Sequence, residues 1–172
     1  MSYESDAAVQ RATGFLELGL AEEALSELDD LPPPLRQESL ILHLRVDAYF
    51  RMKRWAEAAE ICVPKLETEA SDVAWWIQAG YALRRSASLT KAEETLCKAL
   101  EFHPKHSLIH YNLACYACVD GREEEARERL VKATEEDVDL YLKMAKDDPD
   151  LVRIRPWVIA WQAQRREQLS PQ

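Results

Sequence analysis

Apolar residues recur along this chain with the three- and four-residue spacing of amphipathic helices, and short polar turns separate the segments. Only four glycines stand against many Ala, Leu, Glu, Lys and Arg residues, a composition that favours helix over sheet. The pattern predicts an all-α protein in which the helices come in pairs. We expect first helices at 5–18, 38–52, 72–86 and 106–119, and second helices at 21–31, 55–68, 89–102 and 122–135.

A longer period lies over the helical one. Ala24, Ala58, Ala92 and Ala126 follow one another at intervals of 34 residues. A fixed period of roughly 20–50 residues marks a solenoid, in which no unit buries its apolar face alone. A small side chain at a repeated position also lets two helices approach to roughly 8–10 Å. Residues 1–140 should therefore hold four helix-pair repeats, at 5–38, 39–72, 73–106 and 107–140.

The repeats resemble those of the tetratricopeptide repeat (TPR) family over about residues 5–140. That resemblance implies an all-α, right-handed superhelix that acts as a non-enzymatic protein-binding scaffold, with a peptide or helix held in its concave groove. The matching positions are Phe15 and Ala24 in the first repeat, Leu42, Tyr49 and Ala58 in the second, Trp76, Gly80, Ala92, Ala99 and Pro104 in the third, and Leu113, Ala114, Ala126 and Ala133 in the fourth.

Prolines interrupt this pattern at two places. The run Pro32-Pro33-Pro34 should end the second helix of the first repeat near Asp30 or Leu31, since proline cannot continue a helix. Pro64 falls inside the predicted helix 55–68, where it removes a donor and crowds the preceding turn. We expect a kink at Pro64, or a break after which the helix resumes.

Residues 141–172 lie outside the repeats and should form a helical cap in the same domain, because the last repeat of a solenoid needs a covering element. A capping helix is expected over 139–146, with Asp148 capping a further turn, and a final helix from Pro156. Trp157 and Trp161 should share a face of that helix. They either seal the last repeat or form an aromatic site for a partner.

Charge and cysteine content narrow the function. The net charge of −9 and the sequence pI near 5.0 argue against nucleic-acid binding, which needs a basic face. The sequence shows neither a signal peptide nor an apolar run long enough to span a bilayer. Four cysteines in such a chain are expected to be reduced thiols, which indicates a cytoplasmic protein.

The resemblance also implies which first-helix side chains line the groove. The third repeat carries five basic and three acidic residues, whereas the first carries two and eight, so the groove should be basic at its middle. Arginines there would bind an acidic segment or a C-terminal carboxylate of a partner; alternatively, they only solvate helix ends or pair with neighbouring acids. The candidate groove residues are Asp47, Phe50, Arg51, Ile77, Tyr81, Arg84, Arg85, Tyr111, Asn112 and Cys115, with Cys118 beside them.

Other functions have weaker support. One TPR subgroup uses a clamp of Lys and Asn residues to hold chaperone C-termini. Asn112 fits one position of that clamp, but Ile77 and Tyr81 stand where the clamp needs Lys and Asn. A self-associating structural subunit and a small secretion-type chaperone stay as alternatives.

A metal site or an enzyme is not expected. The Cys115-x-x-Cys118 pair, with His103, His106 and His110 before it, offers zinc ligands, yet it has no second such pair and is interpreted as groove-lining thiols. The acidic runs 123–125 and 135–137 suit helix ends. No catalytic constellation, metal site or cofactor site is predicted, and the partner and oligomeric state stay open.

Overall fold

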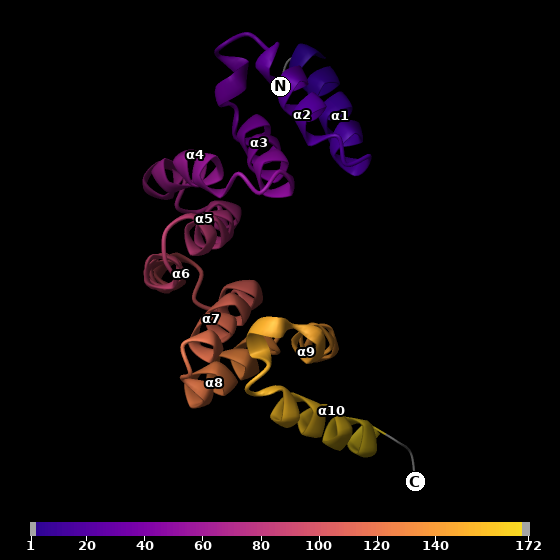
Figure 1. Cartoon of the computed structure of the whole chain (residues 1–172), viewed down its shortest axis with the longest axis vertical. Helices are drawn as coiled ribbons and strands as arrows, with labels where there is room; N and C mark the ends of the chain where they lie inside the picture. Colours follow the sequence, from indigo (N-terminus) through magenta and orange to yellow (C-terminus); the bar gives the residue numbers. More distant parts are fainter. Residues whose placement is uncertain (1–2, 170–172) are drawn as a thin grey trace. The chain divides into compact units, whose positions relative to one another are not determined.

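A computed structural model describes residues 3–169 of the chain, with side chains from 6 to 167. Within that range the chain forms ten α-helices and two 3-10 helices and has no strands, which confirms the all-α prediction (Figure 1). The elements are α1 (Tyr3–Glu17), α2 (Ala21–Asp29), η1 (Leu35–Gln37), α3 (Ser39–Arg51), α4 (Trp55–Thr68), α5 (Val73–Ser86), α6 (Leu89–Phe102), α7 (Ser107–Val119), α8 (Glu123–Ala133), α9 (Val138–Asp147), η2 (Pro149–Leu151) and α10 (Arg155–Leu169).

The helices fall into two compact units, one up to Ala92 and the other from Glu93 onward. In the first unit, α3 lies between the α1–α2 pair and the α4–α5 pair (Figure 1). Its core has two clusters, one built around Ala12, Leu16 and Leu28 and the other around Cys62 and Trp75. Within residues 3–169, no helix is long and apolar enough to cross a membrane.

In the second unit, α7 packs along α8 and is covered by η2, while α10 packs against α9. Most of α7 is buried, including Leu113 and the two cysteines of its last turns. The cap contributes Leu151, Ile154 and Val158, all fully buried. Residues 151–158 thus contribute apolar side chains to the core of this unit, and the ring centroids of Trp157 and Trp161 on α10 lie 5.0 Å apart. Whether they serve as a seal or as a partner site stays a prediction.

The repeated alanines are all buried inside the protein. The four alanines spaced by 34 residues all have 0 % of their surface exposed. On the first helices, the residues twelve positions before Ala92 and Ala58 are Gly80 and Val46. Gly80 is buried, and Val46 has 0 % of its surface exposed. The periodic residues of the sequence are therefore packing residues.

The turns inside three of the four repeats have the same backbone conformation. Gly19, Lys53 and Gly121, which occupy equivalent repeat positions, have φ values of 77°, 58° and 83°. The next N–H in each case bonds back to a carbonyl five residues earlier, for example Arg54 to Tyr49 at 2.8 Å, as in a Schellman motif. Ala87, at the same position of the third repeat, instead has φ −127°. Lysine thus stands where two other repeats use glycine.

The helix breakers act largely as expected. Helix α2 ends at Asp29, with Asp30 as its C-cap, just before the triple proline. Helix α4 runs through Pro64 to Thr68, so the expected interruption is not a break. The Asp148 carboxylate accepts a 2.9 Å bond from the Asp150 N–H and caps η2, as predicted.

Candidate protein-binding face

Three aromatic rings meet where α3, α4 and α5 converge in the first unit. Phe50 lies in the last turn of α3, and Trp55 opens α4 directly after the turn at Lys53. The ring of Tyr81 on α5 lies 5.1 Å from Phe50 and 5.6 Å from Trp55, in both cases edge to face. All three rings are half-buried, so each has a surface open to solvent, and Phe50 also packs against the core cluster around Cys62 and Trp75.

Arg85 lies over this aromatic cluster. Its guanidinium carbon is 5.4 Å from the centre of Trp55 and 5.0 Å from that of Tyr81. A cation–π contact of this kind stabilises by about 0.5–1 kcal/mol at an exposed site. Among the described residues the Arg85 guanidinium forms no hydrogen bond or ion pair, so its five N–H donors stay available to a ligand. The arrangement orients a cation and keeps its donors available.

Arg51 is held differently. Its Nε donates to both carboxylate oxygens of Asp47 at 3.2 Å, and its Nη1 donates to the carbonyl oxygen of Leu16 at 2.8 Å, which joins α3 to the end of α1. The pairing with Asp47 is the alternative that the sequence left open for these arginines. Arg84 and Ile77 are half-buried on α5, and Arg84 has a partner of its own.

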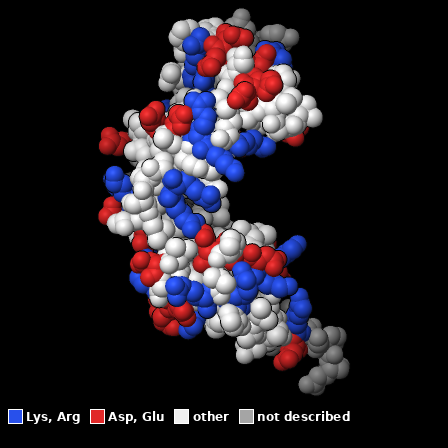
Figure 2. Space-filling model, viewed as in Figure 1, with Lys and Arg blue, Asp and Glu red and all other residues white. Residues whose placement is uncertain are grey.

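Charge is unevenly distributed over this unit. Figure 2 shows Lys and Arg side chains gathered over α3 and α5, with Asp and Glu side chains over α1 and α2. The basic patch agrees with the composition of the third repeat. An acidic ligand would therefore meet a favourable potential at the aromatic cluster.

The α7 candidates belong to the second unit and have other surroundings. The Tyr111 hydroxyl donates to Oδ2 of Asp148 at 2.8 Å, and the Cys115 Sγ donates to the same oxygen at 3.6 Å. Tyr111 is 4 % exposed and Cys115 3 % exposed, whereas Asn112 is half-buried. The sequence predicted that Tyr111, Asn112 and Cys115 line an open groove. In the structure Tyr111 and Cys115 are instead buried, and both donate to Asp148 of the cap. Burial, the Cys115 thiol and the Asp148 bond together raise the pKa of Tyr111 well above its usual range.

The histidines do not join the thiols in a metal site. Among the described residues, a group of three potential metal ligands has its ligand atoms within 4.8 Å of one another, and it consists of Cys115, Asp148 and Asp150. His110 is buried, its Nε2 is 2.9 Å from the carbonyl oxygen of Pro104, and burial lowers its pKa. Cys118 is fully buried. The group of close ligand atoms in the described residues thus includes Cys115 but none of the histidines and not Cys118.

We call the surface formed by Phe50, Trp55, Tyr81 and Arg85 the Arg85 face. The sequence analysis did not predict Trp55 as one of its residues. Trp55 has no aromatic counterpart in the other repeats, where Ala21, Leu89 and Glu123 stand at its position. The signal in the sequence was this departure from the repeat, because the packing shared by the other repeats does not use an aromatic side chain at this position.

Known structures confirm the fold, although no protein-family model and no curated protein sequence matches the chain. A structure of the MamA RS-1 ArsTM double mutant is 17 % identical, with a TM-score of 0.65 over 86 % of this chain and 80 % of that one. MamA residues 41 to the end from Desulfovibrio magneticus RS-1 is 18 % identical, with a TM-score of 0.66 over 84 % and 78 %. MamA AMB-1 is 19 % identical, with a TM-score of 0.61 over 77 % and 78 %. With its 34-residue period and paired helices, this chain has the TPR-like repeat fold.

Proposed function

We propose that the chain is a non-enzymatic protein-binding module, and that Arg85 anchors an acidic segment or a C-terminal carboxylate of its partner. The observation that carries the proposal is the position of the Arg85 guanidinium over Trp55 and Tyr81. Both rings are half-buried, and together they hold a cation at the surface.

The physical case rests on orientation. A free arginine side chain loses considerable rotamer entropy when it binds, and two rings that already restrict it reduce that loss. A carboxylate in the plane of the guanidinium then accepts two parallel hydrogen bonds. The edges of Phe50 and Tyr81 add apolar surface for a neighbouring partner side chain.

Arg51 has a secondary role in this proposal. A partner carboxylate would compete with Asp47 for its Nε, and its Nη1 is engaged by Leu16. Tyr111 and Cys115 contribute no contacts while the cap covers them. Of the remaining candidate residues, Ile77 and Arg84 belong to the same unit as Arg85 and extend the face, whereas Asn112 belongs to the second unit.

Affinity capture from source lysate, quantified by mass spectrometry, tests the proposal with three baits: the wild type, Arg85→Glu and Lys98→Glu. Lys98 is exposed on α6, so its reversal is a matched control for net charge. The expected result is one set of proteins that is lost only with Arg85→Glu. Equal capture by all three baits contradicts the proposal, and sedimentation velocity over a range of concentrations tests the self-associating alternative.

A further inference from the structure

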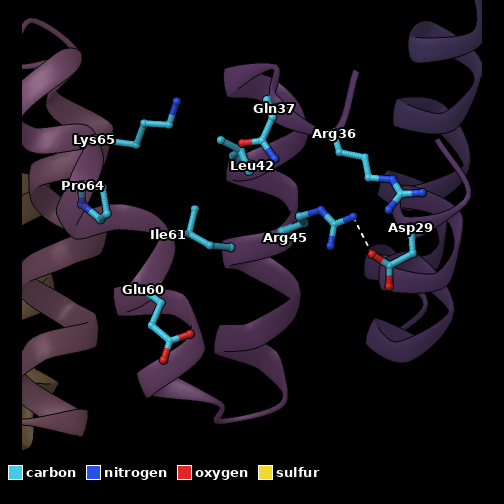
Figure 3. Close-up of a pocket in the computed structure, with 9 residues that line it drawn as sticks. All are labelled: Asp29, Arg36, Gln37, Leu42, Arg45, Glu60, Ile61, Pro64 and Lys65. Atoms are coloured by element: carbon cyan, nitrogen blue, oxygen red, sulfur yellow. Dashed lines mark hydrogen bonds and ion pairs between the residues drawn. The ribbon is translucent and has the colours of Figure 1, made fainter. Parts of the chain in front are cut away.

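A cleft lies on the side of α3 away from Asp47 and Arg51. This cleft of about 450 Å³ opens between the end of α2, η1, α3 and α4 (Figure 3). Leu42 and Arg45, three residues apart on α3, line it, whereas Asp47 and Arg51 belong to a different helical face. The volume falls in the range of about 300–1,000 Å³ that is typical of ligand clefts.

Two arginines bring unused donors to this cleft. The Nε of Arg36 donates to the carbonyl oxygen of Leu31 at 2.5 Å, and among the described residues its two terminal nitrogens have no protein partner. Arg45 uses only Nη2, which donates to the carbonyl oxygen of Leu28 at 2.9 Å and to Asp29 at 2.6 Å. Each guanidinium is thus held in place by its protein contacts while other N–H groups stay available.

The wall between the cations is apolar. Figure 3 shows Leu42 and Ile61 between the two arginines and Lys65, which stands across the cleft on α4. The Lys65 Nζ is bonded to Glu69 at 2.7 Å, and Pro64 precedes it. A ligand lying across the cleft from η1 to α4 would therefore contact the guanidinium groups at one end and the apolar side chains beside them.

Pro64 also leaves a backbone carbonyl of α4 without its usual helical donor. Because proline has no N–H, the backbone carbonyl of Glu60 lacks the donor that an α-helix would supply four residues later. Glu60 and Pro64 both line the cleft, so the carbonyl that lacks its α-helical donor belongs to a lining residue. A peptide N–H is a natural partner for such a carbonyl.

The charge of the cleft indicates which anion fits. Three basic side chains are offset by Asp29 and Glu60, so the excess of positive charge is small. A doubly charged phosphate would be repelled by the two carboxylates, whereas a single carboxylate next to an apolar group matches both the donors and the wall.

We propose that this cleft binds an extended segment of a partner protein in which an Asp or Glu side chain stands beside an apolar one. The carboxylate bonds to Arg36 and Arg45, the apolar side chain lies against Leu42 and Ile61, and a peptide N–H bonds to the Glu60 carbonyl. The site is separate from the Arg85 face and does not depend on its function.

The test is an NMR titration of the full chain with three short peptides up to millimolar concentration. The probes are amidated Ala-Leu-Glu-Leu-Ala, amidated Ala-Leu-Gln-Leu-Ala, and the second sequence with a free terminal carboxylate. We expect the Glu peptide to shift cleft signals and to bind about tenfold more tightly than the amidated Gln peptide, because only it offers a charged acceptor. Equal binding of these two, no binding, or binding of the free-terminus peptide alone overturns the proposal.

Variants locate the contacts. Arg36→Gln should weaken the Glu peptide about tenfold, and Arg36→Lys should restore only part of the loss, since lysine lacks the planar fork. Pro64→Ala supplies the missing N–H, cannot harm the helix, and should lower affinity several-fold. Lys98→Glu, at an exposed position on α6, is the charge-reversal control and should leave the response of the cleft signals unchanged. Repeating the titration in an Arg85→Glu background removes the Arg85 anchor, so that shifts of the cleft signals there report the cleft alone. Undiminished binding by Arg36→Gln or Pro64→Ala contradicts the assignment.

Discussion

The indole nitrogen of Trp75 donates a 2.9 Å hydrogen bond to Oε2 of Glu69. The same carboxylate accepts from Ser39 Oγ on α3 and from Lys65 Nζ on α4, each at 2.7 Å. One side chain in the loop before α5 therefore ties together three helices of the first unit. The bonds from Lys65, Ser39 and Trp75 lower the pKa of Glu69 from 4.5 to about 2.

This network predicts a pH-dependent stability. Since the folded-state pKa lies below the ordinary value, the stabilisation is complete above pH 4.5 and is lost as the pH falls toward 2. Glu69→Gln should cost about 1 kcal/mol at pH 7, at the low end for charged hydrogen bonds because the side chain is partly exposed. Urea unfolding of both proteins between pH 7 and pH 2.5 measures the effect. Glu67→Gln, at an exposed neighbouring position, should leave the curve unchanged.

The turn at Lys53 offers a stabilising substitution. A lysine at φ 58° bears a steric cost that glycine avoids, so Lys53→Gly should raise the free energy of unfolding by about 0.5–1 kcal/mol. Thermal melting followed by circular dichroism is a suitable measurement. Gly121→Ala should lower stability by about the same amount for the backbone alone, because an added Cβ meets no atom within 4 Å. Ala87→Gly, where φ is negative, should not stabilise.

Overpacking should distinguish the repeated alanines from their neighbours. Ala58→Leu and Ala126→Leu insert bulk where no surface is exposed, and each should cost about 1–3 kcal/mol. Ala56 lies two residues from Ala58 on the same helix but is exposed. Ala56→Leu should change stability by less than about 0.5 kcal/mol. Equal unfolding midpoints for Ala56→Leu and Ala58→Leu would show that the repeat register is misassigned.

Thiol labelling reports on the cap. Cys97 is exposed, whereas Cys62, Cys115 and Cys118 are buried, and burial raises the pKa of Cys62 to about 12. A thiol reagent at pH 8 should modify one cysteine rapidly and three slowly. Deletion of residues 147–172 removes Asp148 and its coverage of α7, so Cys115 should become the second fast site. Mass spectrometry of digested protein identifies the sites, and an unchanged pattern would mean that the cap leaves α7 covered without it.

Substitutions of Arg85 should grade the affinity of a captured partner. Arg85→Glu reverses the charge that a carboxylate meets, and a loss of about tenfold or more is expected with little change in melting temperature. Arg85→Lys should keep only part of the wild-type affinity for the partner, because an ammonium group lacks two parallel donors. Wild-type affinity should also fall as salt rises. Calorimetry with the purified partner measures all three, and indifference to both charge and salt would move recognition to the apolar residues Ile77 and Tyr81.

The helices could be predicted from the sequence because their signals are local. The predicted second helix at 55–68 matches α4 end for end, and the end of α2 follows from the proline run. The burial of Tyr111 could not be predicted in this way, since it depends on Asp148, 37 residues later. The convergence of Trp55, Tyr81 and Arg85 likewise requires the turn at Lys53 and the packing of α4 on α5, which no periodicity specifies.

Asp148 makes the cap cooperative. Its Oδ1 holds the start of η2 through the Asp150 N–H, and its Oδ2 receives the Tyr111 hydroxyl from α7. The turn and its attachment to α7 thus share one carboxylate, and the buried Leu151 follows directly after it. Local folding of this segment and its docking should therefore occur in a single step, so that the end of the solenoid opens as a unit and does not fray residue by residue.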